Sequence, residues 1–333
     1  MLALLADRTL VQMAPDSTEV VARAELGPPL PLAPSGRFLA LSRDGRRLFV
    51  LIPAAPGRAQ EIRVLNVATL RPVLRFALVE GIVFRALAVG TQTGRLYLFG
   101  NRPRRGRTED AVVTVVGPTG ADVQTTTVRA TKGYDWWIID GAVAHDESRI
   151  YVSYHGGWTT GADWMAVTGD ALERCTARSA PGNGCVARVH GGVEALEGGV
   201  LAATGGDPVL QISRTGRVVA TWRLRLPEPR RNHVMEIALD PQGERAYALG
   251  PCQYGGGGVS IIELTTGRTR LLTPAVCGEA IAAGADLVAV GERFDASVLG
   301  APSRVALVNV RSGSVRYAKV PLEAVDLLVV PRR

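Results

Sequence analysis

Aromatic side chains are concentrated in two short segments that could bind a ligand. The segment Tyr134-Asp135-Trp136-Trp137 is followed, less than twenty residues later, by Tyr154-His155-Gly156-Gly157-Trp158. Indole and phenol rings with an exposed edge stack on sugars, aromatic groups and amines, and they dominate the binding energy of many protein interfaces. We therefore expect a ligand or partner to be bound by Trp136, Trp137, Tyr154, His155 and Trp158. The alternative is that Trp136 and Trp137 fill space in the core.

Arginine is clustered in one further segment, at Arg102, Arg104, Arg105 and Arg107. The guanidinium group is a planar donor that suits carboxylates, sulfates and phosphates. We expect Arg102, Arg104 and Arg105 to contribute to binding an acidic partner or a polyanion; a solvated loop is the alternative. Nucleic acid is not an expected partner, because the 38 basic residues of the chain are spread along it and not concentrated on one face.

Histidines and a glycine run provide weaker signals. His155 and His233 have carboxylates near them in the sequence, so a metal site or an acid–base pair is an alternative to simple binding. The sequence lacks the HxH and HExxH motifs, and we expect no cofactor and no metal.

The glycine run Gly255–Gly258 precedes a strand pattern and not the helix that a phosphate loop needs. Tyr254, next to this run, is grouped with the expected binding residues.

Four cysteines form two local pairs, Cys175 with Cys185 and Cys252 with Cys277. They do not show C-x-x-C spacing, so two disulfides are the expected state. Disulfides persist in oxidising compartments, which predicts an extracellular, periplasmic or cell-surface protein. No apolar run reaches the roughly 18 to 20 residues of a membrane span. A signal segment is not visible in this chain, and a membrane tether would lie outside it.

The elements that position these residues repeat along all 333 residues. Each repeat of about 48 residues contains four short strands separated by turn signals such as Asp44-Gly45. This period is typical of a propeller blade. We predict an all-β fold: a seven-bladed β-propeller of four-stranded antiparallel blades, forming a single domain over 1–333. The C-terminal strand, 325–330, is expected to join the N-terminal blade and close the ring.

The expected blades are approximately 1–26 plus 325–331, 36–79, 85–130, 141–190, 192–226, 235–275 and 279–322. In such a fold the longer loops share one rim, and the tight hairpins share the other. The expected binding residues all fall on the loop-rich rim, which is therefore the predicted interaction face. The hairpin rim is expected to hold solvated charge.

Two kinds of segment resemble a known family. Ile62–Thr69 and Val259–Arg268 resemble the third-strand motif of YVTN-like repeat β-propellers, which are related to surface-layer and NHL propellers. Leu41–Phe49 and Leu239–Tyr247 are similar to the first-to-second-strand signature of the same superfamily. The resemblance covers the whole chain and implies a seven-bladed propeller. Members include extracellular binding proteins, scaffolds and enzymes, so the resemblance implies no single activity.

These observations favour an exported, non-enzymatic propeller. It is expected to bind a protein partner, a surface polymer or a small ligand through aromatic and arginine-rich loops on one rim. The alternative is a propeller enzyme, either a metal- or histidine-dependent hydrolase or lyase or a subunit of a redox enzyme, with its site at the axial funnel. The sequence contains no recognisable catalytic set, which favours the binding protein.

Overall fold

The computed structural model describes most of the chain. It leaves out residues 15–17, 28–35, 53–58, 104–108, 130–135, 157–158, 169–170, 175–185, 188–191, 204–207, 215–217, 225–235, 251–256, 275, 293–302, 322–323 and 331–333. For residues 129, 136–139, 154–156, 159–168, 171–174 and 186–187 the backbone alone is described. No helix in the described part of the chain is long and apolar enough to cross a membrane.

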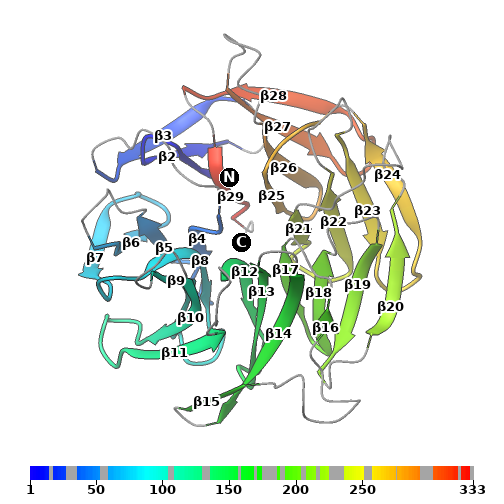
Figure 1. Ribbon diagram of the computed structural model, residues 1–333. Helices are drawn as coiled ribbons and strands as arrows, with labels where there is room; N and C mark the ends of the chain where they lie inside the picture. The colour runs from blue at the N-terminus through cyan, green and yellow to red at the C-terminus, as the bar shows by residue number, and fades with distance from the viewer. Residues whose placement is uncertain are drawn as a thin grey trace. The chain divides into compact units, whose positions relative to one another are not determined.

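Strands form all the named elements of the described chain (Figure 1). Three four-stranded sheets are β29 (Ala324–Leu328) with β1 (Leu2–Leu5), β2 (Thr9–Met13) and β3 (Val20–Glu25); β4 (Leu39–Leu41) with β5 (Arg47–Ile52), β6 (Glu61–Asn66) and β7 (Pro72–Ala77); and β8 (Val83–Val89) with β9 (Leu96–Pro103), β10 (Glu109–Val116) and β11 (Gln124–Arg129).

Three more sheets have the same four-stranded order. They are β17 (Val193–Leu196) with β18 (Gly199–Ala203), β19 (Pro208–Ser213) and β20 (Val218–Arg223); β21 (Glu236–Leu239) with β22 (Arg245–Leu249), β23 (Val259–Glu263) and β24 (Thr269–Thr273); and β25 (Ala280–Ala283) with β26 (Leu287–Glu292), β27 (Arg304–Asn309) and β28 (Val315–Lys319). The remaining sheet has five strands, β12 (Trp136–Val143), β13 (Arg149–Gly156), β14 (Thr159–Thr168), β15 (Ala171–Arg174) and β16 (Val186–Ala187).

The prediction of seven four-stranded blades is wrong, because the described structure contains six four-stranded antiparallel blades. The sheet that departs from the pattern contains β14, which is ten residues long. At one end of β14, Gly161 and Ala162 pair with β16, and at the other end Met165–Thr168 pair with β15. The outermost position of this sheet is therefore shared by two short strands, which the repeat period did not indicate.

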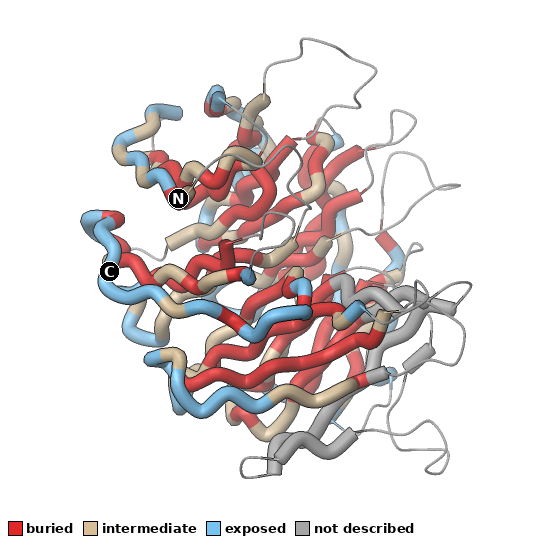
Figure 2. The backbone as a smooth tube through the Cα atoms, turned by 60° about the vertical axis from the view of Figure 1, so that its left-hand side comes forward, coloured by how far each residue is buried: buried red, intermediate tan, exposed pale blue. Residues whose placement is uncertain are grey.

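The chain divides into two compact units, which are described separately. Unit 1 comprises Met1–Ser35, Ala203–Val209 and Thr221–Arg333, and unit 2 comprises Gly36–Ala202 and Leu210–Ala220. In both units burial follows the position of a strand in its sheet. Arg47–Ile52 is buried except for its first residue, whereas the outer strand Pro72–Ala77 is largely exposed. Figure 2 shows buried residues along the strands and exposed residues at turns and on outer strands.

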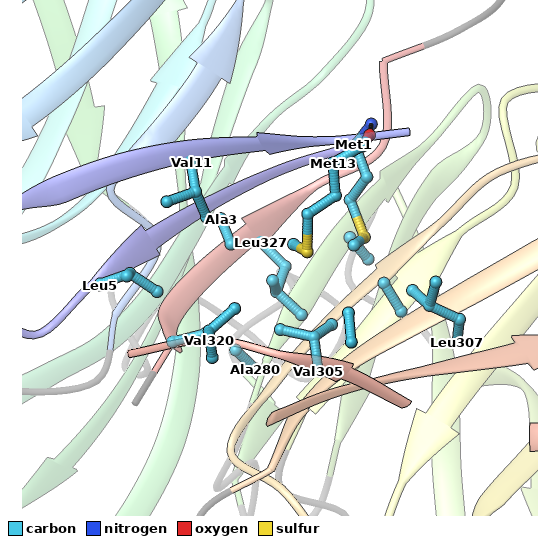
Figure 3. Close-up of a cluster of buried hydrophobic side chains, with 14 residues drawn as sticks. Met1, Ala3, Leu5, Val11, Met13, Ala280, Val305, Leu307, Val320 and Leu327 are labelled. Carbon is cyan, nitrogen blue, oxygen red and sulfur yellow. Dashed lines mark hydrogen bonds between the residues drawn. The ribbon is translucent and has the colours of Figure 1, made fainter. Parts of the chain in front are cut away.

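In unit 1 the two ends of the chain meet in one sheet. β29 pairs antiparallel with β1, and Ala3 lies opposite Leu327. The sequence predicted this pairing, but the strand spans Ala324–Leu328 and not 325–330. Met1, Met13 and Leu327 belong to a buried cluster between this sheet and β25–β28 (Figure 3). The pairing covers the open edge of β1 and places apolar side chains from both ends in one core.

In unit 2 the first strands of successive sheets lie side by side, in the order β4, β8, β12 and β17. Arg37, just before β4, forms a parallel bridge with Ala86 of β8. Apolar side chains fill the space between neighbouring sheets, for example Phe99 of β9 with Val152 of β13. These first strands carry the charged cluster described below.

Candidate functional site

The paired strands β12 and β13 bring the two aromatic segments of the sequence together. Trp137 lies opposite His155, Trp136 opposite Gly156, and Ile138 opposite Tyr154. Opposed positions in an antiparallel pair have Cα atoms about 4.5 to 5.5 Å apart. Four of the predicted binding residues, although separated in sequence, are therefore backbone neighbours at one end of a single sheet.

Of the other predicted binding residues, the structure describes Arg102. This residue is half-buried near the end of β9 and lies opposite Asp110 of β10. The rest of the set falls outside the described residues: Arg104, Arg105, Trp158, His233 and Tyr254.

Cys277 is the cysteine that the structure describes, and it is disulfide-bonded. Cys175, Cys185 and Cys252 lie outside the described residues, so the predicted pairings stay predictions. Gly257, five residues after Cys252, approaches Cys277 closely. A Cβ atom on Gly257 would lie 3.3 Å from the Cβ of Cys277 and 2.5 Å from the carbonyl oxygen of Val276. Gly257 thus lies next to Cys277, which fits the pairing of Cys277 with Cys252.

A charged cluster on the first strands of unit 2 was not predicted as a site. Arg37 Nη2 lies 2.9 Å from Asp140 Oδ2 and 3.2 Å from Glu194 Oε1. Arg37 precedes β4, Asp140 is in β12 and Glu194 is in β17. One guanidinium group therefore bridges carboxylates from two other sheets, which requires the first strands of these sheets to converge.

Backbone hydrogen bonds hold the cluster in place. The Arg37 N–H donates to the carbonyl of Arg85 at 3.1 Å, and the Leu87 N–H donates to the carbonyl of Arg37 at 2.8 Å. The Val193 N–H donates to Asp140 Oδ2 at 2.9 Å, which ties the start of β17 to β12. The register of β12 shifts between Ile138 and Asp140, a bulge of the kind that redirects a side chain.

Burial dominates the electrostatics of the cluster. It raises the pKa of the Asp140 carboxyl, although Arg37 and the backbone N–H groups of Val193 and Gly141 oppose the change. Burial also raises the pKa of Glu194; Arg37 opposes this increase, and the negative charge of Asp140 adds to it. The Asp140 side chain is 3% exposed, whereas those of Arg37 and Glu194 are 22% and 23% exposed. The cluster is thus closed behind Asp140 and partly open at Arg37 and Glu194.

The chemistry open to this cluster follows from its charges. Two ionised carboxylates and one guanidinium leave one negative charge in excess. Asp140 Oδ1 is buried and meets no hydrogen-bond donor of good geometry among the described residues. A cluster of this kind can exchange a proton or bind a cationic group. Within the described chain no three His, Cys, Asp or Glu side chains are grouped as a metal site.

The sequence contained a signal for this cluster. Arg37, Asp140 and Glu194 each lie within two residues of the start of an expected blade, next to an apolar run. A charged side chain buried at such a position costs free energy unless it has a partner. The three charges could have been matched to one another on that basis, but their distances could not.

The prediction that the hairpin rim holds solvated charge is wrong for Glu147. This residue lies in the turn between β12 and β13, is 7% exposed, and has a φ of 53°. Its carboxylate accepts hydrogen bonds from the Thr93 N–H at 2.9 Å and from the Tyr97 hydroxyl at 3.2 Å. Burial alone would raise the pKa of Glu147, but hydrogen bonds lower it overall, first that of the Thr93 hydroxyl and then those of the Thr93 and Gln92 N–H groups and Tyr97. His145, in the same turn, is exposed as expected.

Comparisons with solved structures identify the fold. The chain is similar to the RRP9 WD40 repeats, with a TM-score of 0.62 and 13% identity over 93% of this chain and 90% of that one. It is also similar to the periplasmic gluconolactonase PpgL of Pseudomonas aeruginosa, with a TM-score of 0.60 and 14% identity over 97% and 96%. A chain of the nidogen/laminin complex matches with a TM-score of 0.52 and 10% identity over 85% and 98%.

These similarities show that the chain has a β-propeller fold, and at such low identity they show the fold alone. The sequence matches no family profile and no curated protein at a significant level. The similar structures include both an enzyme and a protein complex, so they do not select a function.

Proposed function

We propose that this β-propeller is an exported, non-enzymatic binding protein that holds its ligand where β12 begins and β13 ends. The partner is a protein, a surface polymer or a small ligand. The observation that carries the proposal is the register that sets Trp137 opposite His155 and Trp136 beside them. Aromatic residues gathered at one end of a rigid sheet form a ready surface for stacking and for hot-spot contacts.

The position of Arg102 supports a binding face at the same end of unit 2 as the aromatic residues. β9 and β13 are the second strands of neighbouring sheets, and Arg102 lies near the end of β9 as His155 does near the end of β13. Arg104 and Arg105 follow directly in the sequence. Together with the aromatic residues, these arginines favour an acidic protein or a polyanionic polymer as the partner.

Two observations support export. Cys277 is disulfide-bonded, and disulfides persist in oxidising compartments. PpgL, one of the structures of similar fold, is periplasmic.

The segments that resemble the third-strand motif, Ile62–Thr69 and Val259–Arg268, lie on β6 and β23. This position supports placing the chain among YVTN-like propellers.

Quenching of tryptophan fluorescence by acrylamide tests the binding face without a known ligand. A double variant, Trp136→Phe with Trp137→Phe, should lose a measurable part of the fluorescence that acrylamide reaches. The control, Trp222→Phe, removes a tryptophan that is 7% exposed and should leave the accessible fluorescence unchanged. The proposal fails if Trp136 and Trp137 contribute none of the accessible fluorescence.

A second experiment tests the class of partner. Dextran sulfate and neutral dextran of equal length are passed over the immobilised full chain. A polyanion-binding face predicts that dextran sulfate alone binds, and that replacing Arg102, Arg104 and Arg105 with Gln weakens binding at least tenfold. Equal binding of both polymers, or no effect of the substitutions, would remove the arginines from the proposed face.

The charged cluster of unit 2 favours acid–base catalysis as a second candidate function. Glu194 is a partly exposed carboxyl group with a raised pKa, as a proton donor requires. Hydrolysis of gluconolactone by the wild type and by Glu194→Gln, measured from pH 4 to pH 9, tests this candidate. A rate that depends on pH and disappears in Glu194→Gln would favour an enzyme.

A further inference from the structure

We propose that Arg37, Asp140 and Glu194 form a binding site for the primary ammonium group of a small ligand, separate from the aromatic face. Arg37 holds Glu194 and Asp140 together through one nitrogen, Nη2, so both carboxylates face one region of the converging first strands. The site belongs wholly to unit 2 and does not depend on the function proposed for the ends of β12 and β13.

Charge is the first argument. When both carboxyl groups are ionised, Arg37 offsets one negative charge and the other remains in excess. Removing a second charge from water without a counter-charge is costly. A ligand that carries one positive charge would bring the cluster to neutrality.

The unused acceptor is the second argument. Asp140 Oδ2 already accepts from both Arg37 and the Val193 N–H. The buried Oδ1 meets no donor of good geometry among the described residues, and the side chain is 3% exposed. A buried acceptor without a donor costs free energy, so a ligand that supplies an N–H here is favoured.

Access is the third argument. Glu194 contacts Arg37 through Oε1. The side chain of Glu194 is 23% exposed, and that of Arg37 is 22% exposed. A ligand can therefore reach the cluster from this side, make first contact with the Glu194 carboxylate and approach Asp140 behind it.

The chemistry of the donors selects the ammonium group among cations. A primary ammonium carries one charge and three N–H donors, which match an excess charge of one and free carboxylate oxygens. A divalent ion is disfavoured because its two positive charges exceed the single excess negative charge, and because the Arg37 guanidinium would repel it. A quaternary amine would supply the charge but no donor, and an alcohol would supply a donor but no charge.

Thermal unfolding of the full chain with n-propylammonium chloride tests the proposal directly. Ligands that bind the folded state raise its melting temperature with concentration. At constant ionic strength and pH 7, we expect n-propylammonium to raise the melting temperature in a saturable way. n-Propanol and tetramethylammonium should have little effect. No shift with n-propylammonium, or equal shifts with all three compounds, would overturn the proposal.

Matched variants assign the binding to the cluster. Calorimetric titration with n-propylammonium should show affinity at least tenfold weaker for Glu194→Gln than for wild type. Glu197→Gln, an exposed residue three positions along the same hairpin, should bind as wild type does. The Trp136→Phe/Trp137→Phe variant should also bind as wild type does, which separates this site from the aromatic face. Equal affinity of Glu194→Gln and Glu197→Gln would overturn the assignment.

Discussion

The Thr93 hydroxyl donates a 2.6 Å hydrogen bond to the carboxylate of Glu147, joining the turn after β8 to the turn after β12. Glu147 and Asp140 are both buried carboxylates of the same sheet, but their surroundings differ. Hydrogen-bond donors of the neighbouring sheet surround Glu147, and its pKa is lowered. Asp140 has one oxygen without a good donor, and its pKa is raised. The hydrogen bonds of Glu147 link two sheets. The surroundings of Asp140 are those expected of a ligand-binding site.

Replacing Glu147 with Gln should destabilise the protein by about 2 kcal/mol, because an amide cannot accept hydrogen bonds on both of its terminal atoms. The donors left without a full partner are buried between two sheets, including the hydroxyls of Thr93 and Tyr97. Urea unfolding at pH 7 measures the difference. Glu80→Gln, at an exposed position, is the control and should change stability by less than about 0.5 kcal/mol. Equal stability of the two variants would show that the link contributes nothing.

The same variant should remove part of the acid sensitivity of the protein. A carboxyl with a lowered pKa in the folded state stabilises that state above its unfolded pKa, which is about 4.3 for Glu. This stabilisation disappears as the pH falls through the lower, folded value. The difference in unfolding free energy between wild type and Glu147→Gln should therefore be constant above about pH 5 and shrink below about pH 4. A difference that grows on acidification would contradict the assignment.

The Arg37 cluster should respond to pH in the opposite sense. Because the pKa values of Asp140 and Glu194 are raised, the folded state retains protons that the unfolded state releases. The contribution of these two groups to stability therefore falls as the pH rises above about 4. Arg37→Gln leaves two carboxylates without their cation and should cost about 3 kcal/mol at pH 7. Part of that loss should be recovered at pH 5, where the carboxyls protonate more readily. Urea unfolding at both pH values checks this, and a loss that is larger at pH 5 would refute it.

The sequence predicted the β-propeller fold and the pairing of the terminal strands because both follow from periodic patterns of apolar residues and turns. The turn signal Asp44-Gly45 lies between β4 and β5, with Gly45 at a φ of 63°. The fifth strand of the β12–β16 sheet was missed because it depends on the length of β14 and on a return of the chain, Val186–Ala187, that has no local signal.

The predicted binding residues stay predictions, and the charged cluster was not predicted. Composition and spacing identified Trp137 and His155 as candidates, and strand pairing set them opposite one another. The cluster of Arg37 with Asp140 and Glu194 joins residues about 50 to 160 positions apart. Such contacts depend on how three sheets converge, which a single sequence does not encode in any local pattern.

Gly141, next to Asp140, should not tolerate a side chain. A Cβ atom at this position would lie 2.3 Å from Cδ1 of Phe99, whose side chain is fully buried. Overpacking of this kind costs about 1 to 3 kcal/mol, so Gly141→Ala should be destabilised by that amount. Gly198→Ala is the matched control, because a Cβ there meets no atom within 4 Å. If Phe99→Leu restores the stability of Gly141→Ala, the contact with Phe99 is the cause; if both alanine variants unfold alike, it is not.

All four cysteines should be oxidised in the purified, unreduced protein. Cys277 is disulfide-bonded, and Gly257 lies close to it, which fits a bond to Cys252. Thiol titration of the denatured, unreduced protein should find no free thiol, and mass spectrometry after proteolysis should join Cys252 to Cys277 and Cys175 to Cys185. Two free thiols would eliminate one of the predicted pairs, and a Cys277 bond to a different cysteine would replace both pairings.

The last strand should stabilise unit 1 through Leu327. This residue is 4% exposed, lies opposite Ala3 of β1, and belongs to the same buried cluster as Met1 and Met13. Leu327→Ala leaves a cavity in that cluster and should cost about 3 kcal/mol. Val21→Ala, on the outer strand β3 at 57% exposure, is the control and should cost less than about 0.5 kcal/mol. Hydrogen exchange should show faster opening of β1 and β29 in Leu327→Ala, and unchanged protection there would mean that the paired ends contribute little to stability.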